Sequence, residues 1–348
     1  MPTVDPDDIA NFFPLDLNAT KPVHVEGSGK ESRLYRVTGS KLIPEAAPVG
    51  TVYIVDTHAG GMVACHPHIV GDNLKTLCRE AANHFVMAAK AVRVLTEDAA
   101  ILHILRAGAG YMVADVIKGA PIVDVRTEYR TGGYRAHSDD PRRLVVSYRR
   151  YPEGLDDADT IVVPDTYATG RSAEAALLDL MGNGFKPDRI VLYGFMAVPA
   201  LIRLGALCEE HSVDLHSFAI CDLTQLAHNK YDMCIYGPDE SLYKETRRRG
   251  ALGSVIDRAT LRRLLPFYIP GLDQPGDWSE RQSLLFDGVT NRSGDIRGHL
   301  VKSIGLIETL MEMNAGEEWY TETHEAAARE ELGLLRKRLM DSGDLQLK

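Results

Sequence analysis

Short β-branched apolar runs alternate with stretches of helical periodicity between residues 51 and 220, and this alternation restricts the possible folds most. Strands separated by helices form a parallel sheet that helices cover on both faces. We therefore predict an α/β fold. The runs that predict strands are TVYIVD (51–56), AILHIL (100–105), PIVDV (121–125), DTIVVP (159–164), RIVLYGF (189–195) and VDLHSFAI (213–220).

Helical spacing of apolar residues predicts a long helix over 72–95, and further helices are expected from Tyr111, Arg171 and Val198. HAGG after the first strand predicts a turn. Residues 126–150 contain seven arginines interrupted by GG and DDP, which predicts a two-stranded arm with a mobile tip. Most of these arginines are expected to form a solvated face.

Changes of pattern divide the chain into three predicted parts. Residues 1–50 are rich in Pro, Asp and Gly and are expected to form an irregular arm. Residues 51–243 form the predicted α/β core, and residues 244–348, with their Arg-rich helical segments, a helical extension packed on it.

Charge and cysteine content exclude several classes of protein. The net charge of −10 over 348 residues argues against general binding to nucleic acid or to an anionic membrane, although a cationic ligand fits it. Five cysteines without a CxxC pair favour neither a disulfide framework nor a zinc knuckle. The acidic start, without a signal-peptide pattern or a long apolar run later, favours a cytoplasmic location.

The most informative segment is DTIVVPDTYATGRSAEAALLDLMGNG, residues 159–184, in which a strand leads through a small-residue loop into a helix. Unpaired N–H groups at a helix start favour anions, so the loop around Thr169 and Ser172 is suited to a phosphate. Asp165 follows the strand, where a carboxylate can accept hydrogen bonds from ribose hydroxyls. The combination predicts a site for a ribose 5-phosphate.

Two loops in this order resemble those of a known family. PDTYATGRS resembles the signature loop of type I phosphoribosyltransferases, which bind 5-phosphoribosyl 1-pyrophosphate (PRPP). ILRAGAGYM (104–112) resembles the RAGxGM pyrophosphate loop of uracil phosphoribosyltransferases, and HPHIVGDNLKTLCRE (66–80) resembles the start of their first long helix. The order and spacing agree with that family from about residue 66 to residue 243.

This resemblance implies the phosphoribosyltransferase fold, a pentosyltransferase activity on PRPP and an acceptor, and Mg²⁺ bound with PRPP rather than in a protein cage. Homo-oligomers are implied by analogy. The principal implied residues are Asp165 for the ribose and Arg106 for the pyrophosphate, since an arginine beyond an apolar strand requires an anionic partner. Further PRPP-binding residues are expected at Ala107, Gly108, Thr166, Ala168, Thr169, Gly170, Arg171, Ser172, Arg126 and Arg130.

The sequence departs from the family in two places. Pro164 precedes Asp165 where the uracil enzymes have an acid and then Pro, so one ribose-binding carboxylate is expected in place of two. The family's uracil-binding segment, YIVPGLGDAGD, has two candidate counterparts: 231–241 (YDMCIYGPDES) at the expected spacing, and 268–278 (YIPGLDQPGDW) some thirty residues later. Candidate acceptor-binding residues are therefore Tyr236, Gly237, Asp239 and Asp277.

Three functions remain open from the sequence: transfer to uracil or a related base, transfer to an amine or hydroxyl of a natural-product intermediate such as an aminocyclitol, and a non-catalytic PRPP sensor. The resemblance puts uracil or a related base first, while the altered base segment, the C-terminal extension and the acidic charge motivate the second. The complete RAGAG loop and the absence of a basic nucleic-acid-binding module oppose the third. His66 and His68 have no carboxylate or Cys at ligand spacing, so packing or capping roles are expected for them and no protein-bound metal is predicted.

Overall fold

The computed structural model describes residues 4–26, 32–130 and 143–344. Its central sheet has the strand order β1-β2-β3-β9-β8-β7-β4-β5-β6, with β12 paired to β9. The six strands from β3 to β5 in this order run parallel, as predicted, and antiparallel pairs flank them at both edges. The parallel strands are β3 (Thr51–Thr57), β4 (Ala99–Leu105), β5 (Ile122–Arg130), β7 (Thr160–Pro164), β8 (Arg189–Ala197) and β9 (Asp214–Thr224).

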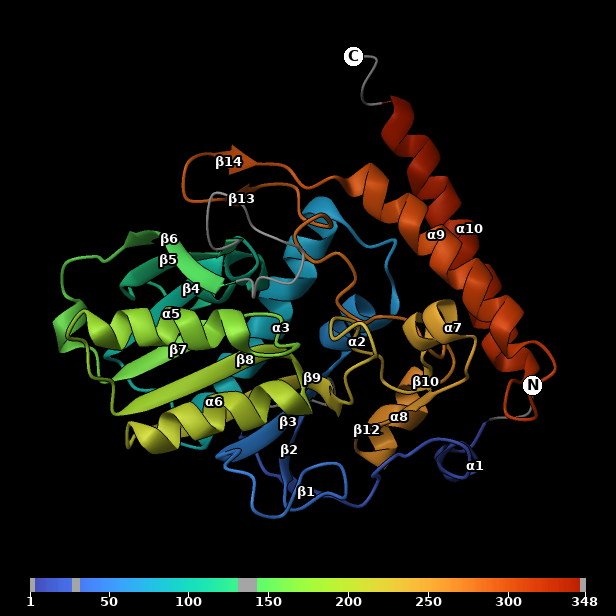
Figure 1. The fold of residues 1–348 in the computed structure, drawn as a ribbon, viewed down its shortest axis with the longest axis horizontal. Helices are drawn as coiled ribbons and strands as arrows, with labels where there is room; N and C mark the ends of the chain where they lie inside the picture. Colours follow the sequence, from blue (N-terminus) through green and yellow to red (C-terminus); the bar gives the residue numbers. More distant parts are fainter. Residues whose placement is uncertain (1–3, 27–31, 131–142, 345–348) are drawn as a thin grey trace.

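Helices cover both faces of this sheet (Figure 1). Alternate residues of β7 enter different cores: Val162 packs in the cluster that includes α3, whereas Ile161 and Val163 pack with α5 and α6. This period-two burial is what a doubly covered strand requires. The helices of the α/β core are α2 (His58–Cys65), α3 (Gly71–Ala91), α4 (Val113–Val116), α5 (Arg171–Gly182) and α6 (Val198–Glu210).

Local differences from the expected elements have simple causes. A helix, α2, begins at His58 where HAGG predicted a turn, because the Thr57 side chain accepts from the Gly60 N–H and caps it. The helix expected from Tyr111 is a 3₁₀ turn, Gly108–Tyr111, followed by the single turn of α4. Met112 between them is left-handed, which interrupts a continuous helix.

The first fifty residues contain regular structure where an irregular arm was expected. Helix α1 (Pro6–Ala10) and strands β1 (Thr20–Val23) and β2 (Ser32–Val37) form there, and β2 pairs with β3 at the sheet edge. Leu34 and Tyr35 are buried in this position. Strand β2 is stabilised by its pairing with β3, which is a tertiary contact. The sequence of β2 alone has too irregular a pattern to predict a strand.

The predicted two-stranded arm consists of β5 and β6 (Arg143–Arg150), and its expected tip, with Arg135 and Arg142, lies outside the described residues. Helix η2 (Leu155–Asp157) leads from it to β7. None of the described helices combines the length and apolar character that crossing a membrane demands.

The C-terminal part consists of helices, as expected, together with short strand pairs. Its elements are β10 (Gly237–Pro238), α7 (Glu240–Thr246), β11 (Ala251–Leu252), β12 (Ser254–Val255), α8 (Arg258–Leu264), β13 (Leu285–Phe286), β14 (Asn291–Arg292), α9 (Ile296–Asn314) and α10 (Glu322–Asp344). Leu261 and Tyr268 share one buried cluster with α3, while α9 and α10 pack on each other around Leu310 and Leu335 (Figure 1). The segment between α8 and α9 reaches the carboxyl ends of the parallel strands.

Candidate active site

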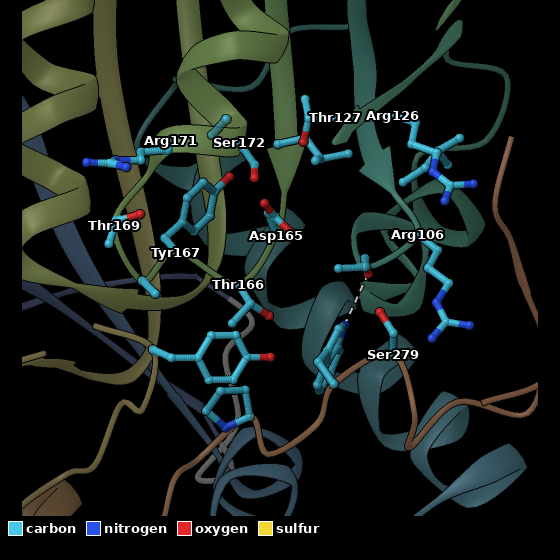
Figure 2. A pocket seen from close by; sticks show the side chains of 18 of the residues that line it. Arg106, Arg126, Thr127, Asp165, Thr166, Tyr167, Thr169, Arg171, Ser172 and Ser279 are labelled. Carbon is cyan, nitrogen blue, oxygen red and sulfur yellow. Dashed lines mark hydrogen bonds between the residues drawn. The ribbon is translucent and has the colours of Figure 1, made fainter. Parts of the chain in front are cut away.

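A cavity of about 930 Å³ opens at the carboxyl ends of β4 and β7. The loop after β7 forms one wall, and Arg106 and Arg126 lie on the opposite side, with Asp165 between them (Figure 2). Ligands of open α/β sheets bind at this end of the strands. The two loops singled out in the sequence therefore face a single space.

The loop from Asp165 to Ser172 is held by backbone pairing to β8. Asp165 N–H donates to Tyr193 O (3.0 Å), Tyr167 N–H to Phe195 O (2.8 Å) and Ala197 N–H to Tyr167 O (2.9 Å). Helix α5 then begins at Arg171, and no side chain caps it. Its first N–H groups are thus available to a ligand in the cavity.

Gly170 closes the loop in a conformation that only glycine adopts freely. Its φ is +75°, and a Cβ there would stand 3.1 Å from Ala200 Cα. Arg203 of α6 donates to Thr169 O (3.0 Å) and pairs with Glu174 (2.9 Å), which holds the loop from outside. The cradle is therefore formed before any ligand arrives.

Asp165 is a buried carboxylate that lines the cavity, with only 6% of its surface exposed. Burial raises its pKa from 3.8 to about 7, and the Thr166 N–H opposes this by donating to the carboxylate. Thr166 in turn shares a 2.6 Å hydrogen bond with Tyr111 through its hydroxyl. Asp165 therefore gains stabilisation in its charged form from any ligand hydroxyls that donate to it.

The loop after β4 brings Arg106 and Ala107 to the cavity but not Gly108. Gly108 is buried, and a Cβ there would meet Pro164 O at 2.8 Å, so glycine lets this loop approach β7 closely. Trp278 from the C-terminal part donates its indole N–H to Ala107 O (3.1 Å) and stacks on Tyr111 with ring centroids 4.4 Å apart. The C-terminal part thus contacts the loop after β4 directly.

The structure brings together most of the predicted PRPP-binding residues. Arg126 lines the cavity and donates to Asp287 O (2.8 Å), whereas Arg130 is exposed at the end of β5 and does not line it. The residues expected from the loop after β7 all line the cavity: Thr166, Ala168, Thr169, Gly170, Arg171 and Ser172.

Of the four candidate acceptor-binding residues, one lines the cavity and three lie elsewhere. Asp277 lines the cavity, as do Pro275 and Trp278 of the same segment. Tyr236 is fully buried, and its hydroxyl lies 3.0 Å from His324 Nε2. Gly237 of β10 pairs with Leu252 of β11. Neither residue lines the cavity.

Asp239 also lies outside the cavity: its carboxylate caps α7 by accepting from Leu242 N–H (3.0 Å), and its other oxygen accepts from His228 N–H (2.8 Å) of a separate loop. The late segment, 268–278, therefore reaches the cavity even though its spacing differs from the family pattern.

Several cavity residues escaped the sequence reasoning, namely Lys230, Ser279, Glu280, Asp287 and Arg292, whereas Tyr231, which also lines the cavity, begins the candidate segment 231–241. Glu280 pairs with Arg106, and Arg292 pairs with Asp287 (2.6 Å). These residues come from loops and a two-residue strand that carry no periodic signal. The one sequence signal for them was the presence of charged residues soon after Gly276-Asp277-Trp278, at the end of the candidate segment 268–278.

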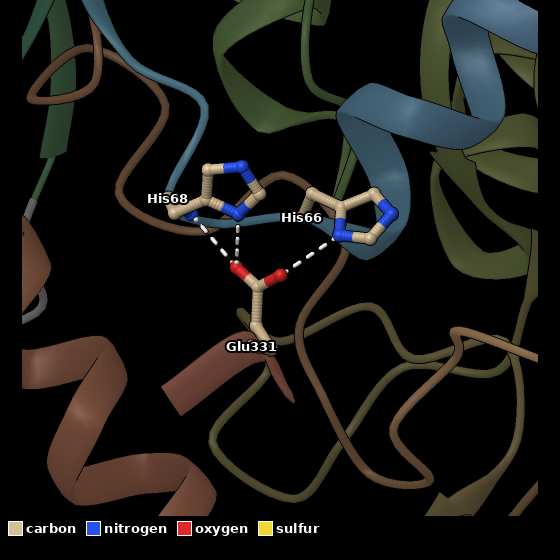
Figure 3. Close-up of side chains that lie close together, drawn as sticks. All are labelled: His66, His68 and Glu331. Atoms are coloured by element: carbon tan, nitrogen blue, oxygen red, sulfur yellow. Dashed lines mark hydrogen bonds and ion pairs between the residues drawn. The ribbon is translucent and has the colours of Figure 1, made fainter. Parts of the chain in front are cut away.

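His66 and His68 lie outside this cavity, and each directs Nδ1 to Glu331 of α10 (Figure 3). Among the described residues, this is the one group of three His, Cys, Asp or Glu side chains that could hold a metal ion. The carboxylate that the sequence spacing lacked is thus supplied by the C-terminal helix.

Comparison with known proteins agrees with this geometry. The family model for uracil phosphoribosyltransferase matches residues 72–231. This segment belongs to the type I phosphoribosyltransferase family. The matched range contains β4, β7 and both loops of the cavity. No curated protein matches the sequence.

Several solved structures show a weak likeness to the phosphoribosyltransferase domain. An adenine phosphoribosyltransferase from Trypanosoma brucei, in complex with AMP, pyrophosphate and ribose-5-phosphate, is 15% identical over 51% of this chain and 86% of its own, with a TM-score of 0.33. A purine phosphoribosyltransferase from Pyrococcus horikoshii is 15% identical over 43% and 84%, with a TM-score of 0.26. A hypothetical Neisseria gonorrhoeae protein with bound ppGpp is 17% identical over 36% and 67%, with a TM-score of 0.27.

Proposed function

We propose that this phosphoribosyltransferase moves the 5-phosphoribosyl group from Mg-PRPP to an acceptor and releases pyrophosphate. The observation that carries the proposal is the placement of Asp165 between the α5 cradle and Arg106 in one cavity. A 5-phosphate on the cradle and a pyrophosphate at Arg106 leave the ribose beside Asp165. The cytoplasmic location and a homo-oligomer remain predictions.

The α5 cradle holds the 5-phosphate in this proposal. The N–H groups from Ala168 to Ser172 and the hydroxyls of Thr169 and Ser172 act as donors at the positive end of the α5 dipole. Gly170 and Arg203 fix the loop in advance, so little conformational entropy is lost on binding.

Asp165 binds the ribose hydroxyls in its ionised form. Two hydroxyl donors lower its pKa from about 7 and hold the sugar ring in one orientation. As pyrophosphate leaves, positive charge develops at ribose C1, and the acceptor atom attacks C1 from the opposite face. The barrier falls through positioning and charge stabilisation, and the protein supplies no nucleophile.

Arginines of the opposite wall receive the pyrophosphate. Arg106 and Arg126 lie there, and Arg292 reaches the same cavity from β14. The Glu280 carboxylate forms an ion pair with the Arg106 guanidinium, so the pyrophosphate must displace this carboxylate. Guanidinium donors stabilise the charge of the departing group.

The cavity fits Mg²⁺ carried by PRPP. Asp165, Asp277 and Glu280 supply oxygen atoms of the type that Mg²⁺ prefers, but they come from different walls, and within the described chain no group of three converges there. When bound, the ion neutralises phosphate charge and makes pyrophosphate a better leaving group. Asp165 is the protein carboxylate placed to contact it or its water ligands.

The acceptor site is formed by the segment 268–278 together with Tyr231, in this proposal. Pro275, Asp277 and Trp278 line the cavity, and the segment that contains them resembles the family's base-binding segment, whose final Asp corresponds to Asp277. This supports uracil or a related base as the acceptor. Trp278, stacked on Tyr111, provides a rigid wall beside it.

A cationic amine is the second candidate acceptor, and a cluster of carboxylates supports it. Asp232, Asp273 and Asp277 line a neighbouring cavity of about 540 Å³ that shares Tyr231 and Asp277 with the first. Burial and then mutual repulsion raise the pKa of Asp273. A protonated amine placed beside Asp232 and Asp273 would lower their pKa values and pair with the charge so formed, as an aminocyclitol acceptor requires, whereas Asp277 is already paired with Lys302 of the same cavity (2.9 Å).

The test is pyrophosphate release from Mg-PRPP with two sets of acceptors: uracil and related bases, and amino sugars and aminocyclitols. Release with a base supports the first acceptor, and release with amines alone supports the second. Tight binding of Mg-PRPP without release by either set would overturn the proposed transfer and favour a sensor.

A further inference from the structure

We propose that His66, His68 and Glu331 form a binding site for a divalent transition-metal ion of the zinc class. His66 Nδ1 lies 2.8 Å from Glu331 Oε2, and His68 Nδ1 lies 2.7 Å from Glu331 Oε1 (Figure 3). All three ligand atoms lie within 4.8 Å of one another. The histidines follow α2, and the carboxylate comes from α10, 263 residues beyond His68.

Glu331 occupies an apolar position. It is 2% exposed, and its neighbours on α10, Ala328, Leu332 and Leu335, pack in the core with α9. A carboxylate at such a position is costly unless a cation or several donors compensate it. The described partners of its oxygens are the two imidazoles and the His68 N–H (3.0 Å).

Arg281 is the nearby fixed charge, but its hydrogen bonds go elsewhere. Fully buried, it donates to carbonyl oxygens of Val63, His66, Ile69, Gln274 and Pro275. It therefore compensates Glu331 only through space, and the carboxylate oxygens remain directed at the histidines.

The turn that carries both histidines is held independently of Glu331. Arg281 Nη2 donates to His66 O (3.1 Å), and His299 Nε2 bonds Pro67 O (2.9 Å). Pro67 also restricts the backbone between the two rings. Outer contacts of this kind orient metal ligands in advance, so the two Nδ1 atoms stay directed at one point.

The donor set suits zinc and its neighbours. Two imidazole nitrogens and one carboxylate oxygen bind Zn²⁺, and they favour it over Mg²⁺. Both rings turn Nε2 away from the carboxylate (Figure 3), so each can carry its proton there while the Nδ1 lone pair binds the ion. His66 and His68 are 14% and 22% exposed, which leaves a path for the ion and a place for a water ligand.

Binding requires small movements of these side chains. Ligands of one tetrahedral zinc ion stand roughly 3.4 Å apart when the bonds are about 2.1 Å. Rotations that open the two Nδ1–O separations from 2.8 and 2.7 Å by about 0.6 to 0.7 Å accommodate the ion. None of the three residues lines the active-site cavity, so the ion would fasten α10 to the turn after α2 as a structural clamp.

The experiment uses the full chain without a polyhistidine tag, stripped of metal with EDTA and titrated with Zn²⁺ by calorimetry. We expect one equivalent to bind with a Kd below about 1 μM and to raise Tm. His68→Ala should weaken binding roughly 100-fold. His228→Ala is the matched control, because His228 forms an exposed 3.0 Å pair with Glu245, and it should bind zinc as the parent does.

Cobalt substitution gives a second, spectroscopic readout of the ligand set. The parent loaded with Co²⁺ should show the visible absorption of a four-coordinate site, and Glu331→Gln, if folded by circular dichroism, should lose it. Equal zinc affinity in the parent and in His68→Ala, or no binding at 100-fold excess zinc, would overturn the proposal. The three side chains would then form a hydrogen-bonded clamp only.

Discussion

The carboxylate of Glu280 pairs with the guanidinium of Arg106 in the wall of the active-site cavity, although 174 residues separate them in the chain. The other oxygen of Glu280 accepts from Asp295 N–H (2.6 Å), the residue that caps α9. Arg106 is therefore already neutralised before a substrate arrives, and a pyrophosphate must compete with a carboxylate from the C-terminal part.

Glu280→Gln should strengthen PRPP binding, because the amide keeps the shape of the side chain but no longer competes as an anion. The pair is a quarter to a third exposed, so we expect a gain of about 1 kcal/mol, or about fivefold in the KM for PRPP. Steady-state kinetics at fixed acceptor measure it. Glu308→Gln, which removes an exposed partner of Arg336, is the control. An unchanged or higher KM would show that Glu280 does not compete.

Arg106→Ala should lower kcat/KM at least roughly 100-fold, because a charged donor to the departing pyrophosphate is lost. Its thermal stability should stay near that of the parent, since the side chain is partly exposed. Arg79→Ala, which removes an exposed arginine paired with Asp115, is the control for loss of a surface charge. Full activity of Arg106→Ala would remove Arg106 from the site.

Asp165→Asn should abolish turnover and stabilise the protein above neutral pH. The native pKa of about 7 lies above the unfolded value of 3.8, so the native state binds more protons in that window, and stability falls as pH rises through it. At about 1.4 kcal/mol for each pKa unit, the substitution should stabilise by roughly 4 kcal/mol at pH 8 and little at pH 4. Thermal unfolding at both pH values checks this.

Asp222→Asn is the matched control for this pH effect. Burial also raises the Asp222 pKa to about 7, but Asp222 does not line the cavity. It should show a similar pH-dependent change in Tm while turnover is kept, because the asparagine oxygen can still accept from Gln274 Nε2 (3.0 Å) of the segment 268–278. Loss of turnover in both variants would mean that the activity loss of Asp165→Asn reflects buried charge in general rather than a contact with ribose.

Thr169→Ala should weaken binding of Mg-PRPP by about tenfold, since one hydrogen bond to a charged phosphate contributes about 1.5 kcal/mol. Calorimetry with Mg-PRPP alone measures it without an acceptor. Thr76→Ala, which removes a hydroxyl that donates to Asp72 O on the exposed face of α3, should bind as the parent does. Equal affinity in all three proteins would contradict the phosphate cradle.

Asp277→Ala and Asp239→Ala should separate the two candidate acceptor segments. Asp277 lines the cavity, so its removal should raise the KM for the acceptor and leave the KM for PRPP unchanged. Asp239 caps α7, so its removal should cost about 1 kcal/mol of stability and leave the acceptor KM unchanged. The reverse pattern would transfer acceptor binding to the segment 231–241.

Local patterns were enough to predict the parallel strands of the sheet and the loop that opens α5. The strand ending at Pro164 and the small residues that open α5 predicted the cradle, because a strand, a turn and a helix start are neighbours in the chain. Strands β1 and β2 were not predicted, since their burial depends on pairing with β3 at the sheet edge.

Through these local patterns, the sequence by itself determined the α/β class, the carboxyl-end position of Asp165 and the two facing loops. Only the tertiary structure decided what closes the cavity: Asp277, Glu280 and Arg292 arrive from a segment more than a hundred residues beyond the cradle. It also placed Glu331 between His66 and His68. Contacts between distant segments depend on how helices and loops pack on the sheet. Hydrophobic periodicity indicates which face of a segment is buried but not which distant segment covers it.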